Sequence, residues 1–466
     1  MGWLVAVHIG AGRYGERDEA PYLVLMREAL AHGQTLVASG SASGGSDSAT
    51  ADSHAARVAS GMLGVFERSE LTNAGRGANL TEHGHVECEA SVVCGKTKFV
   101  SACANVRGVA EPSALAHALL HQAASVAAAD TSGEQQQNEQ DPSIVNDTRF
   151  AYGRQAPLVA VGEHARTLAR QFGVETVESD APEDLDAFQV TQKSEAYWRK
   201  WRACFQNAES RIQMTGAPTP PPALDEGIPH ELLLDTVGAI CIDLQGNVAA
   251  ALSSGGIAYK VSGRVGLAGC PRMGCNASNM LLKSSKSRKR KRSSSSSSSE
   301  PTTAAAAVDR NGFAVACTGR GEQFIRSSFV SSLSRALSKK KSSTLDKALR
   351  KSFLVAQEEN GDAPIEGGVL ALSISPLHTK SVKKRERSCG NKDDKDQESQ
   401  VATLQVQLGA AFSTPCMGVG FLHNSGSNSG VPQVQILRQP PFATAQRQDG
   451  RSSTSELSIH VSHLSL

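Results

Sequence analysis

Hydrophobic and polar positions along the chain predict a long series of alternating strands and helices. The clearest stretch lies between Val237 and Ser254, where two runs of small and β-branched residues flank the turn-forming Gln245-Gly246-Asn247. This pattern predicts a buried β-hairpin. Thr236 would stand at the head of its first strand and Ser254 at the end of its second, so two hydroxyl groups would face each other.

The periodicities of strands and of helices run through the rest of the chain. Trp3 to Ile9 is apolar and is predicted to be the first strand, leading into Gly10-Ala11-Gly12. Helical spacing predicts helices over residues 22–37, 49–67, 112–129, 189–212 and 345–358, and a strand-then-helix unit over 158–172. Further strands are expected over residues 86–93, 99–105, 313–317, 369–374, 402–412 and 418–422, the last two being the final core strands. Residues 423–430 and the tail from Gln439 are expected to be unstructured.

Several stretches are too biased in composition to belong to a core. They are the Ser/Gly-rich residues 39–48, the acidic residues 130–147, the low-complexity residues 283–305 and the charged residues 376–400. Residues 183–231 lose core character and include a Pro/Thr/Ala linker, although an ordinary surface loop explains them equally well. The basic run at 287–292 suits a nuclear address or a phosphate contact, and equally a solvated loop.

Composition removes several classes of function. The 48 basic and 46 acidic residues give a net charge of +2, which argues against a general polyanion binder. The 10 cysteines are scattered without a Cys-x-x-Cys motif, so reduced thiols are expected rather than disulfides or metal ligands. We find no export signal and no apolar run of about 20 residues. Ala6 stands where a myristoylation motif needs Ser or Thr. The expected location is the nucleus, the cytoplasm or both.

A glycine motif and a threonine are the first candidates for chemistry. Gly10 to Gly15 fits a dinucleotide-binding pattern, but Pro21 interrupts the helix that this pattern needs. Thr236 alone is an ordinary strand hydroxyl. If the Asp235–Thr236 peptide bond were cut, however, Thr236 would carry an α-amino group of pKa about 8, which can remove its own hydroxyl proton. No histidine is then needed.

Three motifs around this threonine resemble the maturation site of the type 2 asparaginases, a family of N-terminal nucleophile hydrolases. They are Leu-Asp-Thr-Val-Gly-Ala at 234–239, Gly-Asn-Val-Ala-Ala-Ala at 246–251 and Ser-Ser-Gly-Gly at 253–256. Further motifs follow the family's order at residues 7–12, 72–80, 263–266 and 318–322. Asp235 stands where asparaginases usually carry Gly, and in this the chain is similar to the threonine aspartase (taspase) branch.

The resemblance implies the fold and the organisation of the molecule. It implies one α/β four-layer αββα sandwich, with two mainly antiparallel sheets between helical layers. Self-cleavage would give an α part, residues 1–235, and a β part, residues 236–466, with 183–231 as the mobile end of the α part. The two parts would stay together and pair into an α2β2 assembly. Neither a cofactor nor a metal is implied.

The resemblance also assigns roles to site residues. Thr236 would be nucleophile and base, Ser254 would hydrogen-bond its amine, and Asn73 would polarise the carbonyl of Asp235 during self-cleavage. Thr318 and the Gly319 N–H would form the oxyanion hole, and Arg264 with Gly319 would bind substrate. Outside the family, the same residues have plainer interpretations: Asn73 caps a turn, Arg264 is a surface cation and Thr318 is a helix N-cap.

Departures from the family pattern bear on the substrate. Leu267 stands where asparaginases place an Asp that holds the free amino group of asparagine, which favours a peptide-internal Asp. Glu89 replaces a usual Asp, and Cys94 replaces another acidic residue. The first hypothesis is therefore a threonine endopeptidase that cuts proteins, such as nuclear regulators, after Asp. The alternatives are an isoaspartyl peptidase or L-asparaginase, and an inactive scaffold or nucleic-acid adaptor.

Overall fold

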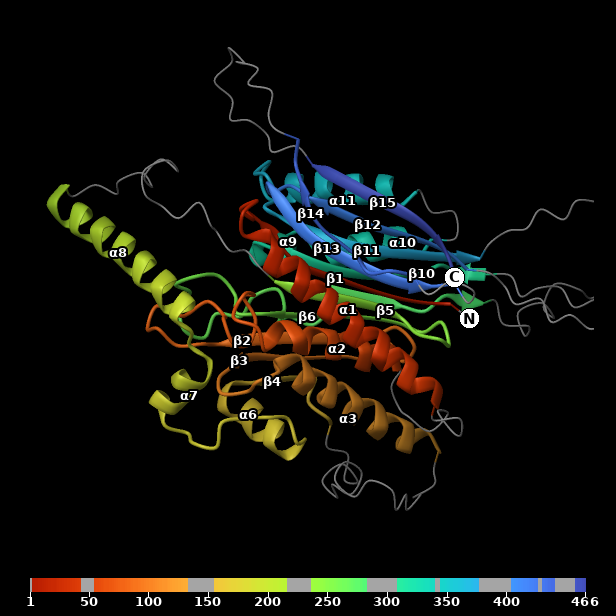
Figure 1. Ribbon diagram of the computed structural model, residues 1–466, viewed down its shortest axis with the longest axis horizontal. Coiled ribbons are helices and arrows are strands. Elements are labelled where there is room, and N and C mark those ends of the chain that lie inside the picture. Colours follow the sequence, from red (N-terminus) through yellow and green to blue (C-terminus); the bar gives the residue numbers. More distant parts are fainter. Residues whose placement is uncertain are drawn as a thin grey trace, which may run out of the picture.

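Two β-sheets lie face to face, and helices cover both outer surfaces (Figure 1). The computed structural model describes residues 2–42, 54–132, 155–215, 236–282, 308–339, 344–376, 404–425, 430–440 and 457–466. In this part of the chain every strand pair of the two large sheets is antiparallel, except that β3 and β4 run parallel. The predicted four-layer αββα sandwich is confirmed.

The larger sheet draws its strands from the whole length of the chain. In spatial order they are β14 (Gln433–Arg438), β13 (Cys416–Asn424), β1 (Trp3–Gly12), β5 (Val237–Ile242), β6 (Val248–Ser254), β2 (Cys88–Cys94), β3 (Val100–Val106) and β4 (Val159–Val161). The central hairpin β5–β6 is as predicted, and Val237 pairs with Ser253. The first and last thirds of the chain therefore meet around Thr236.

The smaller sheet comes from the second half of the chain. Its order is β15 (Ser458–Ser465), β12 (Leu404–Phe412), β11 (Gly367–Pro376), β10 (Gly312–Gly319) and β7 (Cys275–Ser278). A short ladder of β8 (Leu281–Leu282) and β9 (Val308–Arg310) lies apart from both sheets. The carboxyl end of β10 carries Thr318 and Gly319 towards the head of β5.

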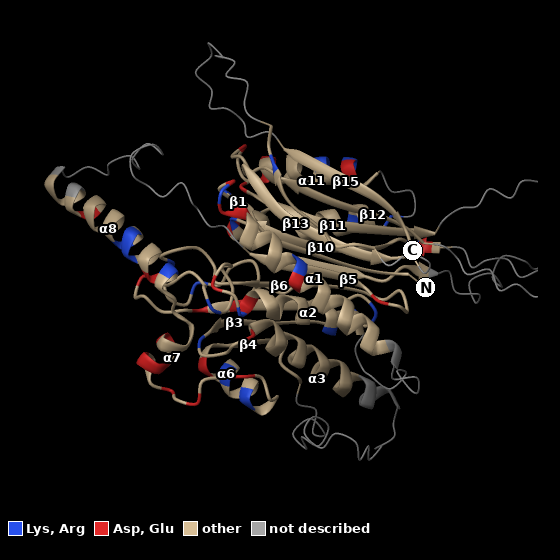
Figure 2. Ribbon diagram, in the orientation of Figure 1, with Lys and Arg blue, Asp and Glu red and all other residues tan. Residues whose placement is uncertain are grey.

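Alternation along the strands of the larger sheet divides their side chains between two cores, one on each face. On β1, Leu4 and Ala6 point between the sheets, whereas Val5 and Val7 pack under helices. Those helices are α1 (Glu19–Ala42), α2 (His54–Glu67) and α3 (Pro112–Ser132); α9 (Gly321–Arg326), α10 (Phe329–Leu337) and α11 (Leu345–Glu359) belong to the other outer layer. Figure 2 shows charged residues on helices and loops and few on the strands, as expected for sheets covered on both faces.

The region after residue 182 corrects one expectation. Residues 183–231 were expected to lose core character, but α7 (Pro182–Gln189) packs Leu185 and Gln189 against the body, and α8 (Gln192–Thr215) confirms the predicted helix. The Gln189 side chain accepts the Gly108 N–H at 2.6 Å and donates to the Val109 carbonyl at 3.0 Å. Two buried amide contacts thus anchor the start of this region.

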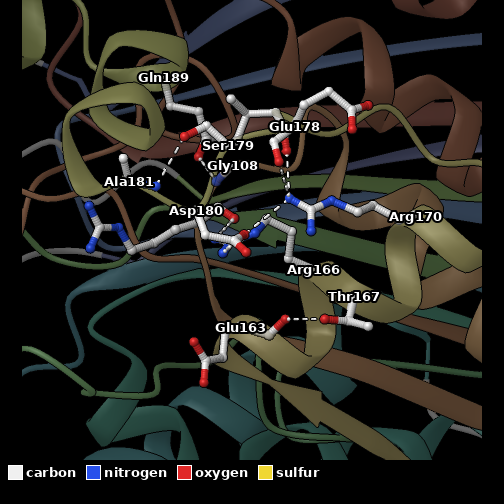
Figure 3. Close-up of polar contacts among 12 residues, drawn as sticks. Gly108, Glu163, Arg166, Thr167, Arg170, Glu178, Ser179, Asp180, Ala181 and Gln189 are labelled. Atoms are coloured by element: carbon white, nitrogen blue, oxygen red, sulfur yellow. Dashed lines mark hydrogen bonds and ion pairs between the residues drawn. The ribbon is translucent and has the colours of Figure 1, made fainter.

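Arginines of α6 (Gly162–Gln171) hold the segment that leads to α7 (Figure 3). Arg166 and Arg170 both donate to Asp180, at 2.7 and 3.2 Å. Arg170 also donates to the carbonyls of Val177 and Glu178. This pairing lowers the pKa of Asp180, because both guanidinium groups hydrogen-bond to its carboxylate. Residues 177–180 are therefore fixed by charge-assisted hydrogen bonds.

Several boundary predictions were wrong. Residues 418–422 were expected to be the last core strand and 423–430 to be unstructured, yet β13 runs to Asn424 and β14 follows at Gln433–Arg438. Helix α1 begins before Pro21 and continues to Ala42, so residues 39–42 of the expected exposed connection are helical. Proline is tolerated there because the first turn of a helix needs no N–H from it. The tail from Gln439 was expected to be unstructured, yet β15 pairs with β12 over eight residues, from Ser458 to Ser465. Its pattern Ser-Ile-His-Val-Ser-His-Leu-Ser alternates with the period of a strand.

Several predicted segments fall outside the described residues. They are residues 43–48 of the Ser/Gly-rich connection, 133–147 of the acidic stretch, 216–231 of the linker, 283–305 with the basic run 287–292, and 377–400. Across the described ranges, the structure contains no helix long and apolar enough to cross a bilayer.

Candidate active site

Thr236 stands at the head of β5, 5% exposed, at the meeting point of the two sheets. Its hydroxyl lies 3.4 Å from the Ser254 hydroxyl, and its main-chain N–H donates to the Thr318 hydroxyl at 3.2 Å. Ser254 was expected to bond to the nitrogen of Thr236, but here it faces the hydroxyl. In this single chain the nitrogen is a peptide N–H, and Thr318 takes its hydrogen bond.

Thr318 is fully buried at the end of β10. Its hydroxyl oxygen accepts the N–H groups of Ala11, at 3.3 Å, and of Thr236. A hydroxyl has two lone pairs and one proton. With both lone pairs directed at N–H groups, the Thr318 hydroxyl can act only as a donor towards any further oxygen.

Gly319 follows Thr318 with a φ of +130°, a conformation that favours glycine. A Cβ there would also collide with the carbonyl oxygen of Glu366, the residue just before the neighbouring strand β11. Both observations explain why glycine stands at this position. Its backbone can approach a substrate oxygen closely, as an oxyanion donor must.

Asn73 lines the same pocket as Gly319 and is 4% exposed. Its side-chain oxygen accepts the Asn79 N–H at 2.7 Å, and its amide nitrogen donates to the Gly256 carbonyl at 2.8 Å. Asn79 donates to the same carbonyl at 2.9 Å. Because the Gly256 bond uses one amide proton, Asn73 has a second for an oxygen beside Thr236.

These residues surround one small pocket. Its lining consists of Asn73, Glu89, Thr236, Ser254, Gly256, Ile257, Arg264 and Gly319. Five predicted site residues are therefore brought together: Asn73, Thr236, Ser254, Arg264 and Gly319. Thr318 contacts Thr236 from behind, and Asp235 lies outside the described residues.

Arg264 forms the charged wall of the pocket and is 15% exposed in its side chain. Its Nε and Nη2 both donate to Oε1 of Glu322, at 2.9 and 2.6 Å. Burial is the largest single effect and raises the pKa of Glu322. Hydrogen bonds from Arg264 and from the Glu322 main chain, together with the charges of Arg264 and Arg320, outweigh it, and the pKa falls below its ordinary value. Glu322 is thus an anion bound to Arg264.

A buried lysine lies in the segment that leads to Arg264. Lys260, 3% exposed, donates to the carbonyls of Glu87 and of Gly255, the latter at 2.6 Å. Burial lowers the pKa of Lys260, and the nearby Glu89 carboxylate opposes that shift. Glu89 accepts the Gly266 N–H at 2.6 Å; burial raises its pKa against the opposing effect of Lys260. The charges compensate each other in a dry environment.

Two further buried groups lie against the hairpin β5–β6, His8 at Gly238 and Glu67 at Ser253. The His8 ring packs so closely on Gly238 that a Cβ there would collide with it. Burial lowers the pKa of His8 to about 3, and the Thr236 main chain nearby raises it slightly, yet neither ring nitrogen has a hydrogen bond of good geometry. Glu67 accepts hydrogen bonds from Ser113 and, at 2.5 Å, from Ser253. Burial raises its pKa to about 7.

Sequence reasoning missed Lys260, Asn79 and the contact of Glu322 with Arg264. Asn79 and Glu322 lie inside recognised motifs, but nothing in a motif shows which atoms meet. Of the two departures noted from the family pattern, Glu89 lines the pocket, whereas Cys94 is buried in the core under the helices. Leu267 packs in the core beneath α9 and α10, and does not line the pocket.

A buried threonine at the head of a central strand, between the sheets of an αββα sandwich, defines the N-terminal nucleophile class of hydrolases. The family model described as asparaginase matches residues 1–157 and 153–285, more than half of the 466 residues. The chain therefore belongs to the type 2 asparaginase family.

Curated relatives show how far the sequence of this chain has diverged from other members of that family. An isoaspartyl peptidase/L-asparaginase from Xenopus laevis is 25% identical over 276 residues, covering 59% of this chain and 67% of that protein. Isoaspartyl peptidases from Salmonella typhimurium and Escherichia coli are each 26% identical over 328 residues, covering 69% of this chain and 75% and 73% of theirs. Identity at this level supports a shared hydrolase class and leaves the substrate open.

Proposed function

We propose that this chain is a threonine endopeptidase that cuts itself between Asp235 and Thr236 and then cuts proteins after Asp, as threonine aspartases do. The observation that carries the proposal is the setting of Thr236. Among the described residues, no carboxylate or imidazole hydrogen-bonds its hydroxyl, which faces Ser254. A base is then best supplied by the α-amino group that cleavage would create.

Self-cleavage would follow from these contacts. The Thr236 hydroxyl attacks the Asp235 carbonyl carbon, its proton passes to the Thr236 nitrogen, and the C–N bond breaks to leave an ester. Water hydrolyses that ester and releases a free Asp235 carboxylate and a free Thr236 amine. The second amide proton of Asn73 and the hydroxyl proton of Thr318 are the donors for the developing oxyanion.

The mature reaction would reuse the same groups. The free amine takes the hydroxyl proton, Thr236 attacks the carbonyl carbon of the substrate Asp, and Thr318 and the Gly319 N–H hold the oxyanion. The proton then passes to the leaving amine, and water hydrolyses the acyl-enzyme. Arg264 binds the substrate carboxylate, and Ser254 orients the nucleophile.

Three observations support a peptide-internal Asp. Asp235 precedes Thr236, so the chain's own cut site has the residue proposed for substrates. Leu267 is in the core and offers no carboxylate to a substrate ammonium. Glu89 does line the pocket, but Lys260 and Arg264 offset its charge. An amino acid with a free ammonium would therefore gain little there.

An isoaspartyl peptidase or L-asparaginase is the second candidate. The names of the curated relatives favour it, and so does the presence of Glu89 in the pocket. If that carboxylate held a substrate ammonium, β-aspartyl dipeptides would be the better substrates. This candidate shares Thr236, Ser254, Thr318 and Gly319 with the first, and differs in what the charged wall recognises.

The test combines processing with a substrate panel. Intact-mass analysis should give two fragments for the purified protein and one for Thr236→Ala. The processed protein is then incubated with a folded protein that carries an exposed Asp-Gly site, with β-aspartyl dipeptides and with asparagine. Turnover of the protein supports the endopeptidase, and turnover of only the small substrates supports the second candidate.

Assembly and location belong to the same proposal. The two fragments would remain an αβ heterodimer, pair into α2β2, and act on nuclear regulatory proteins. The basic run 287–292 is the proposed address. An uncleaved, inactive protein that binds DNA with steep salt dependence would instead point to the scaffold or adaptor.

A further inference from the structure

We propose that Glu322 is a positioning residue for substrate recognition: it holds one edge of the Arg264 guanidinium and so directs the other edge into the pocket. The inference deepens the proposed function, on which it rests for the identity of the bound group, a substrate carboxylate. It concerns a contact between two segments 58 residues apart in sequence.

The geometry of the ion pair identifies which edge is used. A guanidinium has a side edge, formed by Nε and one terminal nitrogen, and an end edge formed by both terminal nitrogens. Nε and Nη2 of Arg264 converge on a single oxygen of Glu322, so Glu322 occupies the side edge. The end edge retains Nη1.

The surroundings of Nη1 place the end edge at the pocket. A Cβ on Gly256 would lie 3.1 Å from Arg264 Nη1, and a Cβ on Gly266 would collide with it. Gly256 and Arg264 both line the pocket that contains Thr236. A carboxylate in this pocket can therefore approach the end edge while Glu322 keeps the side edge.

Exposure and charge fit a positioning role. The Glu322 side chain is 55% exposed and that of Arg264 only 15%. Glu322 can therefore be removed without opening the core, but Arg264 would lose the partner that fixes its torsions. In a competing role, Glu322 would block Arg264 until substrate displaces it. That role would require the Glu322 and substrate carboxylates to bind the same edge of the guanidinium. The geometry points to different edges.

A neighbouring ion pair supplies the control. Arg320 Nε lies 2.5 Å from Glu366 Oε2, with side chains 47% and 44% exposed, and it is absent from the pocket lining. Glu366→Ala therefore removes a similar surface carboxylate close to the site. It leaves the Arg264 side chain untouched.

The experiment measures binding and turnover separately. Succinate is titrated calorimetrically into purified wild type, Glu322→Ala, Glu322→Gln, Glu366→Ala and Arg264→Ala. We expect Glu322→Ala to weaken succinate binding about three- to fivefold, the range for one partly exposed ion pair, and to raise KM similarly with kcat unchanged. Glu322→Gln, which keeps an oxygen acceptor, should fall between, and Glu366→Ala should match wild type.

Two results would overturn the proposal: succinate binding by Glu322→Ala that equals or exceeds that of wild type, or wild-type binding that does not depend on Arg264. Failure of the proposed function has a different signature. In that case the wild type would stay uncleaved and hydrolyse no panel substrate, whereas the succinate titration would still report on Glu322 and Arg264.

Discussion

The pocket has two sides that differ in chemical character. Around Thr236, the partners are hydroxyl groups and main-chain N–H groups that are almost completely buried. Around Arg264, the partners are charged, and Glu322 is half exposed. The difference indicates that the first side governs the chemical step and the second governs recognition. Changes on the first side should lower kcat, whereas changes on the second should alter KM and its dependence on salt.

The largest effect is expected for Thr236→Ala. Loss of the nucleophile should abolish self-cleavage and lower hydrolysis by on the order of 10⁴-fold or more. Folding should survive, because the lost hydroxyl contact is long, at 3.4 Å, and one hydrogen bond is worth about 1 kcal/mol. Intact mass and thermal unfolding test both parts. Residual hydrolysis near the wild-type rate would show that this side of the pocket does not govern chemistry.

Thr318→Val comes next. Valine keeps the shape but removes the proposed oxyanion donor, so kcat should fall about 10²–10³-fold. It also leaves the N–H groups of Ala11 and Thr236 without their acceptor, which should cost about 1–3 kcal/mol for each buried donor. Denaturant unfolding and steady-state kinetics measure the two losses. An unchanged kcat with reduced stability would limit Thr318 to a structural role.

Arg264→Ala tests the charged side of the pocket, which we assign to substrate recognition. Losing a charge-assisted contact worth about 1.5–3 kcal/mol should lower kcat/KM for an aspartyl substrate about 10–100-fold, mainly through KM. Arg264→Lys should recover only part, because an ammonium cannot bind a carboxylate as a fork. Kinetics at low and high salt provide the measurement. A loss confined to kcat would place Arg264 with the chemical groups instead.

The smallest effect on turnover is expected for Glu67→Gln. Because burial raises the folded pKa of Glu67 from 4.5 to about 7, the native state binds the extra proton between those values. The free energy of unfolding should therefore fall as pH rises through this window, by about 3 kcal/mol in total. The neutral Gln should remove that dependence while kcat changes less than about threefold. Melting temperatures of both proteins from pH 4.5 to 8 supply the comparison, and parallel curves would contradict it.

Local sequence was enough for much of the fold. The hairpin β5–β6 was predictable because small, β-branched runs flank Gln245-Gly246-Asn247. The strand β15 was missed because its serines and histidines suggest a solvated tail, whereas its pairing with β12 depends on residues 46 to 60 positions away. Helix α7 was missed for a related reason: Gln189 is polar in sequence, but its amide satisfies backbone groups of Gly108 and Val109.

For the site, the motifs identified residues and left their contacts unknown. Thr236 and Ser254 could be paired from strand register alone. The burial of Lys260 could not, because a lysine after a Gly-Gly turn is usually solvated. Only the folded chain supplies the carbonyls of Glu87 and Gly255, and the Glu89 carboxylate, that make an ammonium acceptable there. Glu322 is similar, since it meets Arg264 across 58 positions of sequence.

The order of strands in the larger sheet determines how two fragments would be held together after cleavage. Strand β1 lies between β13 and β5, and β2 lies beside β6, so three ladders join segments from before Thr236 to segments after it. A cut before Thr236 would therefore yield fragments that are interleaved rather than docked. Neither could leave without dismantling the sheet, and two separately denatured halves would have to rebuild it by a bimolecular encounter. Persistence after such a cut would be a matter of kinetics, governed by how rarely the sheet opens.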